Sequence, residues 1–270
     1  MFENITSLQN PRVKSLITLK KSRERRLLNR IIIEGYREIT LAIDSGFAVK
    51  ELYSCRSLDA GNHLATLSEL VDQRNIFEIS PEVFEKLAYR EASDGLIAVA
   101  EPRFLNLQDL KLSDCPLILV LESVEKPGNL GAVLRTADAA QVDAVLVCDP
   151  LSDLYNPNTI RSSIGCIFTN QVVACSSPEA IAWLREKNIS IFAAALTAAD
   201  FYHETDLSGP VALIMGTEAT GLSKIWLNGA DHQIKIPMLG RIDSLNVSIS
   251  AAVLVFEAMR QRGFSIKFKG

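Results

Sequence analysis

Short apolar segments alternate with amphipathic segments from residue 116 onward, and this alternation limits the possible folds more than any other feature of the chain. The apolar segments have the length of β-strands and span residues 117–124, 144–148, 189–196, 211–215 and 233–238. Helical periodicity marks residues 129–141, 179–188 and 245–261. Strands that are apolar throughout and alternate with helices are typical of a parallel sheet covered on both faces. The sequence therefore predicts an α/β fold with a parallel sheet for residues 116–270.

The first hundred residues mix short strands and helices and predict a second, smaller α/β domain. We expect a basic helix at 12–30, a helix at 37–45 that stops near Gly46, and strands at 30–35, 50–54 and 95–100. Residues 102–115 are polar and lack strong periodicity. We therefore predict a domain at 1–105, a linker at 106–115 and the larger domain at 116–270.

Cysteine, histidine and hydropathy patterns exclude several classes of protein. The five cysteines have no C-x-x-C spacing and the three histidines are dispersed, so we expect no metal site, no disulfide framework and reduced thiols in the cytoplasm. No apolar run reaches the ~18–20 residues that a membrane span needs. The N-terminus has no basic stretch followed by an apolar one, so no signal peptide and no membrane partner are expected.

Basic residues are concentrated at the N-terminus. The formal net charge is −4, but residues 1–30 carry eight basic and two acidic side chains, which is +6 and leaves −10 for the rest. A basic end on an acidic protein indicates a polyanionic partner, and a solvated charged helix face is the alternative. The candidate RNA contacts within this segment are Arg12, Lys14, Lys20, Lys21, Arg23, Arg25 and Arg26.

The first polar junction follows the apolar run at 117–124. It begins the helix whose buried stripe is formed by Leu130, Val133, Leu134 and Ala137. Asn129 lies where a helix N-cap is expected. Arg135 lies off the stripe and could project into the cleft above the strand ends, where open α/β sheets bind ligands. A capping asparagine and a surface arginine are the simpler alternative.

Two further junctions carry glycines and short polar side chains. After the run at 211–215, Gly216 and Gly221 permit a tight turn or a close approach to a ligand, and Glu218 lies between them. A solvated turn glutamate is the alternative. Residues 236–240 then lead into 244–248, where Ser244 or Asn246 could cap the last helix.

The last helix is apolar nearly all round, so it must be buried on more than one side, and a subunit interface is a natural second surface. The chain contains neither G-x-G-x-x-G after a strand nor G-x-x-x-x-G-K-[ST]. This pattern disfavours a Rossmann dehydrogenase, a P-loop NTPase and the common methyltransferase fold.

Together, the three junctions resemble the signature motifs of the SpoU (TrmH-type) RNA ribose methyltransferases of the SPOUT superfamily, over about residues 116–263. Residues 1–105 resemble the L30e-like substrate-binding domain that often precedes them. The matching pieces there are residues 8–14, the basic helix, Glu34-Gly35 and residues 95–99.

The resemblance implies an α/β trefoil knot in the C-terminal domain, a homodimer formed through that domain, and S-adenosylmethionine (AdoMet) bound in the knot loops. The implied cofactor contacts are Leu196, Thr197, Gly216, Ile236, Met238, Leu245 and Asn246. The implied catalytic positions are Asn129, Arg135, Glu218, Ser244 and Asn246. One departure is Ala219, where many members have glycine after the glutamate. No DNA partner is expected.

The implied reaction moves a methyl group from AdoMet to the 2′-hydroxyl of a ribose in tRNA or rRNA. The resemblance assigns proton removal to Arg135, but a guanidinium is a poor base at neutral pH. Binding a phosphate and stabilising the developing alkoxide is the other role open to it. Two further readings are a non-catalytic RNA-binding protein of the L30e type and, within the same superfamily, methylation of a base.

Overall fold

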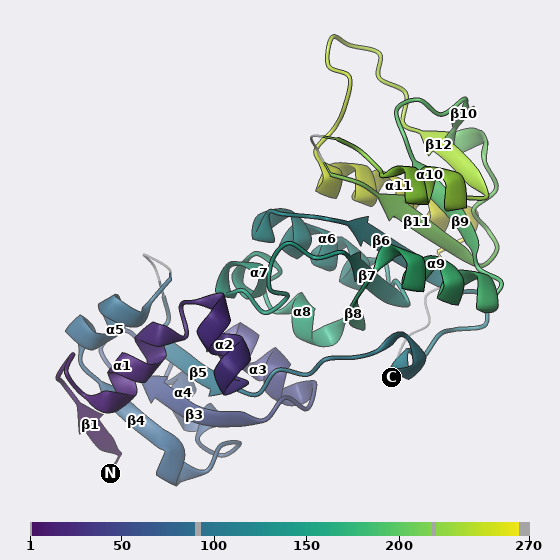
Figure 1. Cartoon of the computed structure of the whole chain (residues 1–270). Coiled ribbons are helices and arrows are strands. Elements are labelled where there is room, and N and C mark those ends of the chain that lie inside the picture. Colours follow the sequence, from purple (N-terminus) through teal and green to yellow (C-terminus); the bar gives the residue numbers. More distant parts are fainter. Residues whose placement is uncertain (1, 90–92, 218–219, 265–270) are drawn as a thin grey trace. The chain divides into compact units, whose positions relative to one another are not determined.

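The computed structural model describes residues 2–89, 93–217 and 220–264. The chain divides into two units (Figure 1). The N-terminal unit runs to Arg103 and also contains Asp153–Thr169, and the C-terminal unit contains Phe104–Ser152 and the residues from Asn170 onward.

A parallel sheet of seven strands forms the centre of the C-terminal unit. The strands are β6 (Leu117–Glu122), β7 (Ala144–Cys148), β8 (Val172–Cys175), β9 (Ser190–Ala194), β10 (Asp200–Phe201), β11 (Val211–Met215) and β12 (His232–Lys235). They lie in the order β10-β12-β9-β11-β6-β7-β8, and every neighbouring pair is parallel. The predicted α/β fold with a parallel sheet is confirmed. The trefoil knot stays a prediction.

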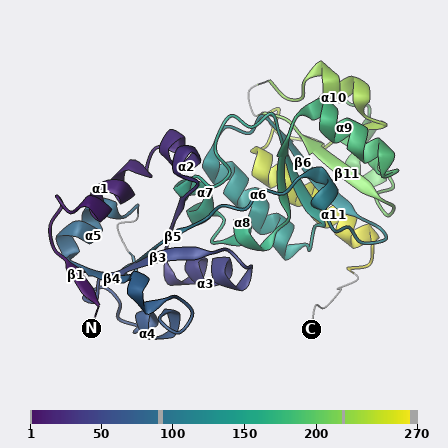
Figure 2. The ribbon, with the colours of Figure 1, turned by 60° about the horizontal axis from the view of Figure 1, so that its bottom comes forward.

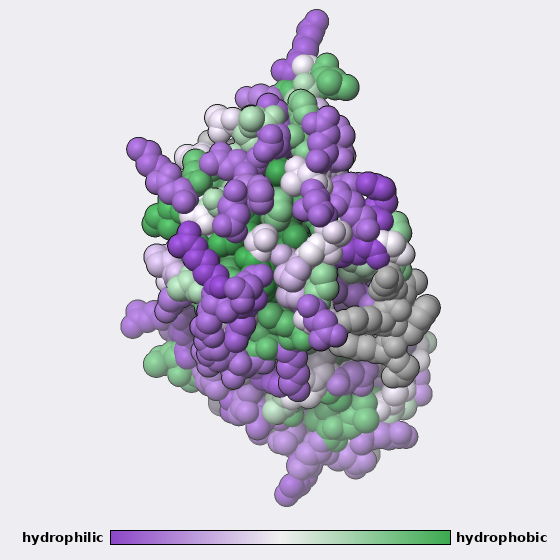
Figure 3. Space-filling view, turned by 90° about the vertical axis from the view of Figure 1, so that its right-hand side faces the viewer, coloured by the Kyte–Doolittle hydropathy of each residue, from purple (hydrophilic) through white to green (hydrophobic). Residues whose placement is uncertain are grey.

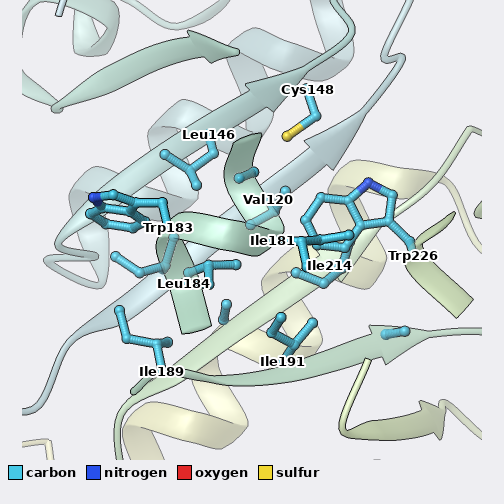
Figure 4. Close-up of a cluster of buried hydrophobic side chains, with 14 of the residues drawn as sticks. Val120, Leu146, Cys148, Ile181, Trp183, Leu184, Ile189, Ile191, Ile214 and Trp226 are labelled. Atoms are coloured by element: carbon cyan, nitrogen blue, oxygen red, sulfur yellow. The ribbon is translucent and has the colours of Figure 1, made fainter. Parts of the chain in front are cut away.

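Helices cover this sheet on both faces and completely bury the central strands β6, β7 and β11, which are apolar nearly throughout. Helices α9 (Ser177–Glu186) and α10 (Lys224–Gly229) pack against each other on one face, and α6 (Pro127–Ala139) and α11 (Val247–Gln261) pack together on the other (Figure 2). Figure 4 shows the core beneath α9, where Trp183 and Leu184 pack on Leu146 of β7. Trp226 of α10 is also fully buried there and donates from its indole nitrogen to Ser177 Oγ at 2.8 Å.

Helix starts and strand ends differ from expectation at two junctions. Asn129 is not an N-cap, because α6 begins two residues earlier at Pro127, and proline is favoured at the first helical position. The strand expected at 233–238 ends at Lys235. By contrast, Asn246 is the N-cap of α11, accepting from the backbone N–H of Ser248 at 2.9 Å.

The N-terminal unit contains a mixed sheet of five strands. They are β1 (Glu3–Ile5), β2 (Ile31–Glu34), β3 (Val49–Ser54), β4 (Ile76–Ile79) and β5 (Leu96–Ala100), in the order β1-β4-β3-β5-β2. Strand β5 is antiparallel to both of its neighbours. The helices that this unit contains before Arg103 are α1 (Pro11–Thr18), α2 (Ser22–Leu28), α3 (Tyr36–Asp44), α4 (His63–Leu67) and α5 (Pro81–Leu87).

The basic segment expected as one helix forms two, α1 and α2. The break lies between Thr18 and Ser22, where Lys21 has an extended backbone. Arg25 stabilises this break, since its Nη1 donates to the carbonyl oxygens of Leu19 and Lys20 at 2.8 and 3.0 Å. These carbonyls at the end of a helix would otherwise need water or another partner.

Residues 153–169 leave the C-terminal sheet after β7 and pack within the N-terminal unit before the chain returns to β8. Helix α7 (Pro157–Ser162) contacts β2, and α8 (Cys166–Thr169) contacts α3. Phe168 packs edge-on against Phe47 with ring centroids 4.9 Å apart. The domain boundaries predicted from the sequence did not include this excursion. The division into two domains at residues 106–115 stays a prediction.

Residues 106–115, expected as a linker, lie against the C-terminal unit. Leu107, Leu110 and Leu112 pack on its buried core, and Leu105 pairs with Val173 of β8. These spaced leucines bury apolar surface that an exposed linker would leave in water. Within the residues that the structure describes, no helix has the length and hydropathy needed to span a bilayer.

Candidate active site

A large cavity of about 490 Å³ opens at the carboxyl ends of β9, β11 and β12. In a parallel sheet the carboxyl ends of all strands lie on the same side, so the loops that follow the strands can meet there. Its walls come from residues 195–197 after β9, residues 216–217 and 220–222 after β11, Ile236 and Met238 after β12, and the segment that leads into α11. The volume lies within the range of about 300–1,000 Å³ found for small-molecule sites.

Six of the seven predicted cofactor residues line this large cavity: Leu196, Thr197, Gly216, Ile236, Met238 and Leu245. Leucine, isoleucine and methionine side chains give it apolar walls, and Thr197, Asp243 and Ser244 add polar atoms. The loop between β12 and α11 projects at the top of Figure 3, where hydrophobic and hydrophilic side chains are both exposed. Asn246 is not part of the lining, and its place is the N-terminus of α11.

The turn after β11 requires glycine at Gly216. A Cβ atom on this residue would lie 2.2 Å from the carbonyl carbon and 2.3 Å from the carbonyl oxygen of Gly221. Thr217 and Gly221 exchange two backbone hydrogen bonds of 3.1 and 3.0 Å, which close the turn. Gly221 itself has a φ of +68°, a conformation that favours glycine. The two predicted positions Glu218 and Ala219 lie outside the described residues.

A small cavity of about 110 Å³ adjoins the large one and shares Gly216, Thr217 and Val247 with it. Its other walls are residues 123–126 and Asn129. Asn246 Nδ2 donates to Asn129 Oδ1 at 3.2 Å and so connects the β6–α6 junction to the start of α11. The fold therefore joins the first and third junctions, although 117 residues separate these two asparagines.

The other two predicted catalytic residues occupy different places. Ser244 lines the large cavity, and its hydroxyl lies 3.4 Å from Asp243 Oδ1. Arg135 is exposed on α6 and belongs to the lining of neither cavity. It lies six residues beyond Asn129, which corresponds to about 9 Å along a helix axis.

Sequence reasoning missed Ser123, which lines the small cavity directly after β6. Its φ is 50°, and Asp149 after β7 has a φ of 48°. Non-glycine residues in this region are uncommon and concentrate at functional sites. The sequence shows that Ser123 is a polar residue directly after an apolar strand, but it does not show the left-handed backbone conformation of this residue. Among residues 2–89, 93–217 and 220–264, no group of three metal-binding side chains is present.

Six of the seven predicted RNA contacts are exposed in the N-terminal unit: Arg12, Lys14, Lys20, Lys21, Arg23 and Arg26. The guanidinium of Arg12 lies 4.3 Å from the centroid of the Phe77 ring and pairs with Glu51 at 2.8 Å. Arg25 differs, because it is only 3% exposed and its Nε donates to Asp153 Oδ2 at 2.8 Å. Charge alone could not separate this buried arginine from its exposed neighbours.

Comparison with known proteins adds two matches along the chain. Residues 116–256 match the model of the SpoU rRNA methylase family, and residues 10–98 match that of the MRM3-like substrate-binding domain. The chain is 30% identical to a Bacillus subtilis (strain 168) protein named 23S rRNA (guanosine(2553)-2′-O)-methyltransferase RlmP. The alignment covers 94% of this chain and 98% of that relative.

Solved structures agree with these matches over nearly the whole chain. The crystal structure of an RNA 2′-O ribose methyltransferase superposes with a TM-score of 0.85 at 40% identity, covering 96% of this chain and 99% of that one. An AdoMet-bound rRNA methyltransferase from Sinorhizobium meliloti superposes with a TM-score of 0.88 at 27% identity, covering 96% and 98%.

Proposed function

Because this chain belongs to the SpoU rRNA methylase family of AdoMet-dependent RNA 2′-O-methyltransferases, we propose that its acceptor is a ribose of 23S rRNA, held in the small cavity beside AdoMet in the large one. The observation that carries this proposal is that the two cavities adjoin and share Gly216, Thr217 and Val247. Asn129 of the small cavity also accepts a hydrogen bond from Asn246 at the start of α11. The alternative of a non-catalytic RNA-binding protein lacks such support, because it gives the large cavity no task.

The residues of the large cavity suit AdoMet. Apolar side chains of Leu196, Ile236 and Leu245 can contact the adenine ring, and the polar atoms of Thr197 and Asp243 can bind the ribose and the amino acid part. Gly216 keeps this wall open, because any side chain there would meet the backbone of Gly221. Bound AdoMet supplies a methyl group that its sulfonium already activates.

The protein must then position the acceptor hydroxyl and stabilise the charge that develops on it. Asn129 lies in the wall of the small cavity, and Asn246 fixes its amide group through the 3.2 Å hydrogen bond. We assign Arg135 to binding the phosphate next to the target ribose and to stabilising the alkoxide, since a guanidinium is a strong anion ligand and a poor base. Ser244 lines the large cavity, and Asn246 caps the helix α11 that begins beside it.

Asn246 has two tasks that substitutions can separate. Asn246→Ala removes both the N-cap and the hydrogen bond to Asn129, so we expect the free energy of unfolding to fall by about 1 kcal/mol and methyl transfer to fall as well. Asn246→Ser keeps a capping oxygen but is too short to reach Asn129, so stability stays close to that of the unchanged protein while methyl transfer falls. Urea unfolding and initial rates measure the two effects, and equal rates for Asn246→Ser and the unchanged protein would contradict the positioning role.

We further propose a homodimer formed through α11. Ile249 and Phe256 are seven residues apart on this helix, so they share one face, and they are 51% and 43% exposed. A second copy of the chain would cover this apolar face. Sedimentation of the wild-type protein should show a dimer. The double variant Ile249→Glu, Phe256→Glu should be a monomer. The control variant Leu151→Glu, which changes another exposed apolar residue of the C-terminal unit, should remain a dimer. A monomer in the unchanged protein refutes the dimer.

The exposed basic residues of α2 and its N-terminus carry the proposed RNA contacts. Replacing Lys21, Arg23 and Arg26 together by glutamine should weaken RNA binding. It should also make the dependence of RNA affinity on salt less steep. The magnitude of the slope of log affinity against log salt concentration should fall by about two to three, close to one for each lost phosphate contact. AdoMet affinity should not change. The control is the double variant Arg56→Gln, Arg74→Gln. It removes exposed arginines that pair with Glu78 and Asp72 and lie outside the proposed RNA surface. Equal slopes for both variants would place the RNA surface elsewhere.

The choice of RNA is tested with full-length protein and labelled AdoMet, offered 23S rRNA, 16S rRNA and tRNA that lack modifications. We expect label in 23S rRNA. Label confined to tRNA refutes the proposed substrate and leaves the enzyme class intact. We also propose that the protein works in the cytoplasm, which the dispersed spacing of its five cysteines supports.

A further inference from the structure

Two cysteines meet at the end of neighbouring strands in the C-terminal unit. Cys148 is the last residue of β7 and Cys175 is the last residue of β8, and the two are paired in register. Their sulfur atoms lie 3.8 Å apart. Strand β8 is the last strand of the sheet, and beyond it Leu105 forms an isolated pair with Val173. The end of β8 at Cys175 can therefore shift without displacing a further strand.

The surroundings of the two thiols differ in a way that suits stepwise oxidation. Cys148 is buried in the core beneath α9, whereas Cys175 is only partly buried. The hydrogen bond with Cys148 lowers the pKa of Cys175, while burial and the carboxylates of Glu179 and Asp149 oppose this shift. The same hydrogen bond, together with burial, raises the pKa of Cys148. Cys175 is therefore the thiol that peroxide can reach first.

We propose that Cys148 and Cys175 are a reversible oxidation site that peroxide converts to a disulfide. The Cys175 thiolate attacks one oxygen of hydrogen peroxide, forming a sulfenic acid and releasing hydroxide. The sulfur of Cys148 then displaces the hydroxyl group from Cys175, which leaves as water with the Cys148 proton. Two thiols lose two electrons in total, and the peroxide is reduced to two molecules of water. A thiol reductant restores the pair.

Backbone hydrogen bonds connect this pair to the small cavity. The N–H of Ser123, which lines that cavity, donates to the carbonyl oxygen of Cys148 at 2.8 Å, and the N–H of Asp149 donates to that of Cys175 at 2.9 Å. The sulfur atoms must approach from 3.8 Å to a bond length of about 2.05 Å, which draws the two strand ends together. If the small cavity holds the acceptor ribose, as proposed above, oxidation should lower turnover and leave AdoMet affinity unchanged.

The thiol chemistry is tested without any activity assay. Full-length protein is treated with hydrogen peroxide, its remaining thiols are blocked under denaturing conditions, and its peptides are analysed by mass spectrometry. We expect a peptide pair linked through Cys148 and Cys175 that a thiol reductant separates. In Cys148→Ser, Cys175 should be trapped by dimedone as a sulfenic acid, and in Cys175→Ser, Cys148 should stay reduced. If Cys148 and Cys175 of the wild-type protein are both recovered as blocked free thiols after peroxide treatment, the proposal is overturned.

Methyl transfer gives the second measurement. Peroxide should lower the turnover of the unchanged protein several-fold, with recovery after reduction, and should not alter the turnover of Cys175→Ser. A disulfide that forms without a change in turnover would overturn the link to the small cavity. If the reduced protein transfers no methyl group, the proposed function fails, and the peptide analysis still decides the oxidation site. Thermal melting of both variants shows whether they fold.

Discussion

Gly216→Ala should weaken AdoMet binding by about tenfold to a hundredfold, because the new Cβ atom would lie 2.2 Å from the backbone of Gly221. The clash is with backbone, so the turn closed by Thr217 and Gly221 must open. In the free protein the turn can open and relieve the clash, so AdoMet binding must close it again at the cost typical of overpacking, about 1–3 kcal/mol. Each 1.4 kcal/mol is about a tenfold change in affinity. Titration calorimetry with AdoMet measures the effect.

Gly128→Ala is the matched control for this prediction. A Cβ atom at Gly128 meets nothing within 4 Å, and the residue lies in the first turn of α6. Alanine is the better helix former, so this variant should fold at least as well and bind AdoMet as the unchanged protein does. Equal AdoMet affinity for Gly216→Ala and Gly128→Ala would show that the large cavity is not the cofactor site.

Arg135→Ala should lower methyl transfer by about 10²–10³-fold, the effect typical of removing one group that stabilises transition-state charge. Its AdoMet affinity should not change, because Arg135 does not line the large cavity. Single-turnover rates with saturating RNA separate this effect from weaker RNA binding. Arg135→Lys should restore part of the rate, since a lysine keeps the charge without the planar fork.

Arg185→Ala controls for the loss of one exposed positive charge. Arg185 lies on α9, on the opposite face of the sheet from α6, and is also exposed. Its replacement should leave the rate unchanged. A rate loss of similar size in both variants would mean that Arg135 acts through general attraction of RNA, and a loss of AdoMet binding in Arg135→Ala would mean that its place in the site has been misjudged.

The parallel sheet could be predicted because its strands are buried on both faces. Val211–Met215 and Ala144–Cys148 are fully buried strands, and both were predicted with the bounds that the structure shows. A strand buried on both faces reads as a continuous apolar run, which a sequence displays directly. The short edge strand β10, with only two residues, produces no such run and was missed.

The excursion of residues 153–169 could not be predicted, because it depends on tertiary contacts. Its helices α7 and α8 have six and four residues, too short for clear periodicity. What holds them is packing against α3 and β2, including Gly165, where a Cβ atom would lie 2.8 Å from Leu41 Cδ1. Contacts between residues more than a hundred positions apart leave no local pattern in the sequence.

The residues of the site could be selected from the sequence, but their arrangement could not. The resemblance named Asn129 and Asn246 separately, and the structure joins them by a hydrogen bond. Ser123 was missed because its significance depends on a left-handed backbone and on the cavity beside it. Arg25 was selected by its charge, although burial and three hydrogen bonds give it a structural role.

Locating the transferred methyl group tests whether this protein methylates a ribose of 23S rRNA. Full-length protein is incubated with 23S rRNA and labelled AdoMet, and the RNA is digested with nuclease P1 and analysed by mass spectrometry. We expect label in a single 2′-O-methylated nucleotide, with the methyl group on the ribose. Label on a base, or no label in RNA while AdoMet binds to the large cavity, would contradict this expectation.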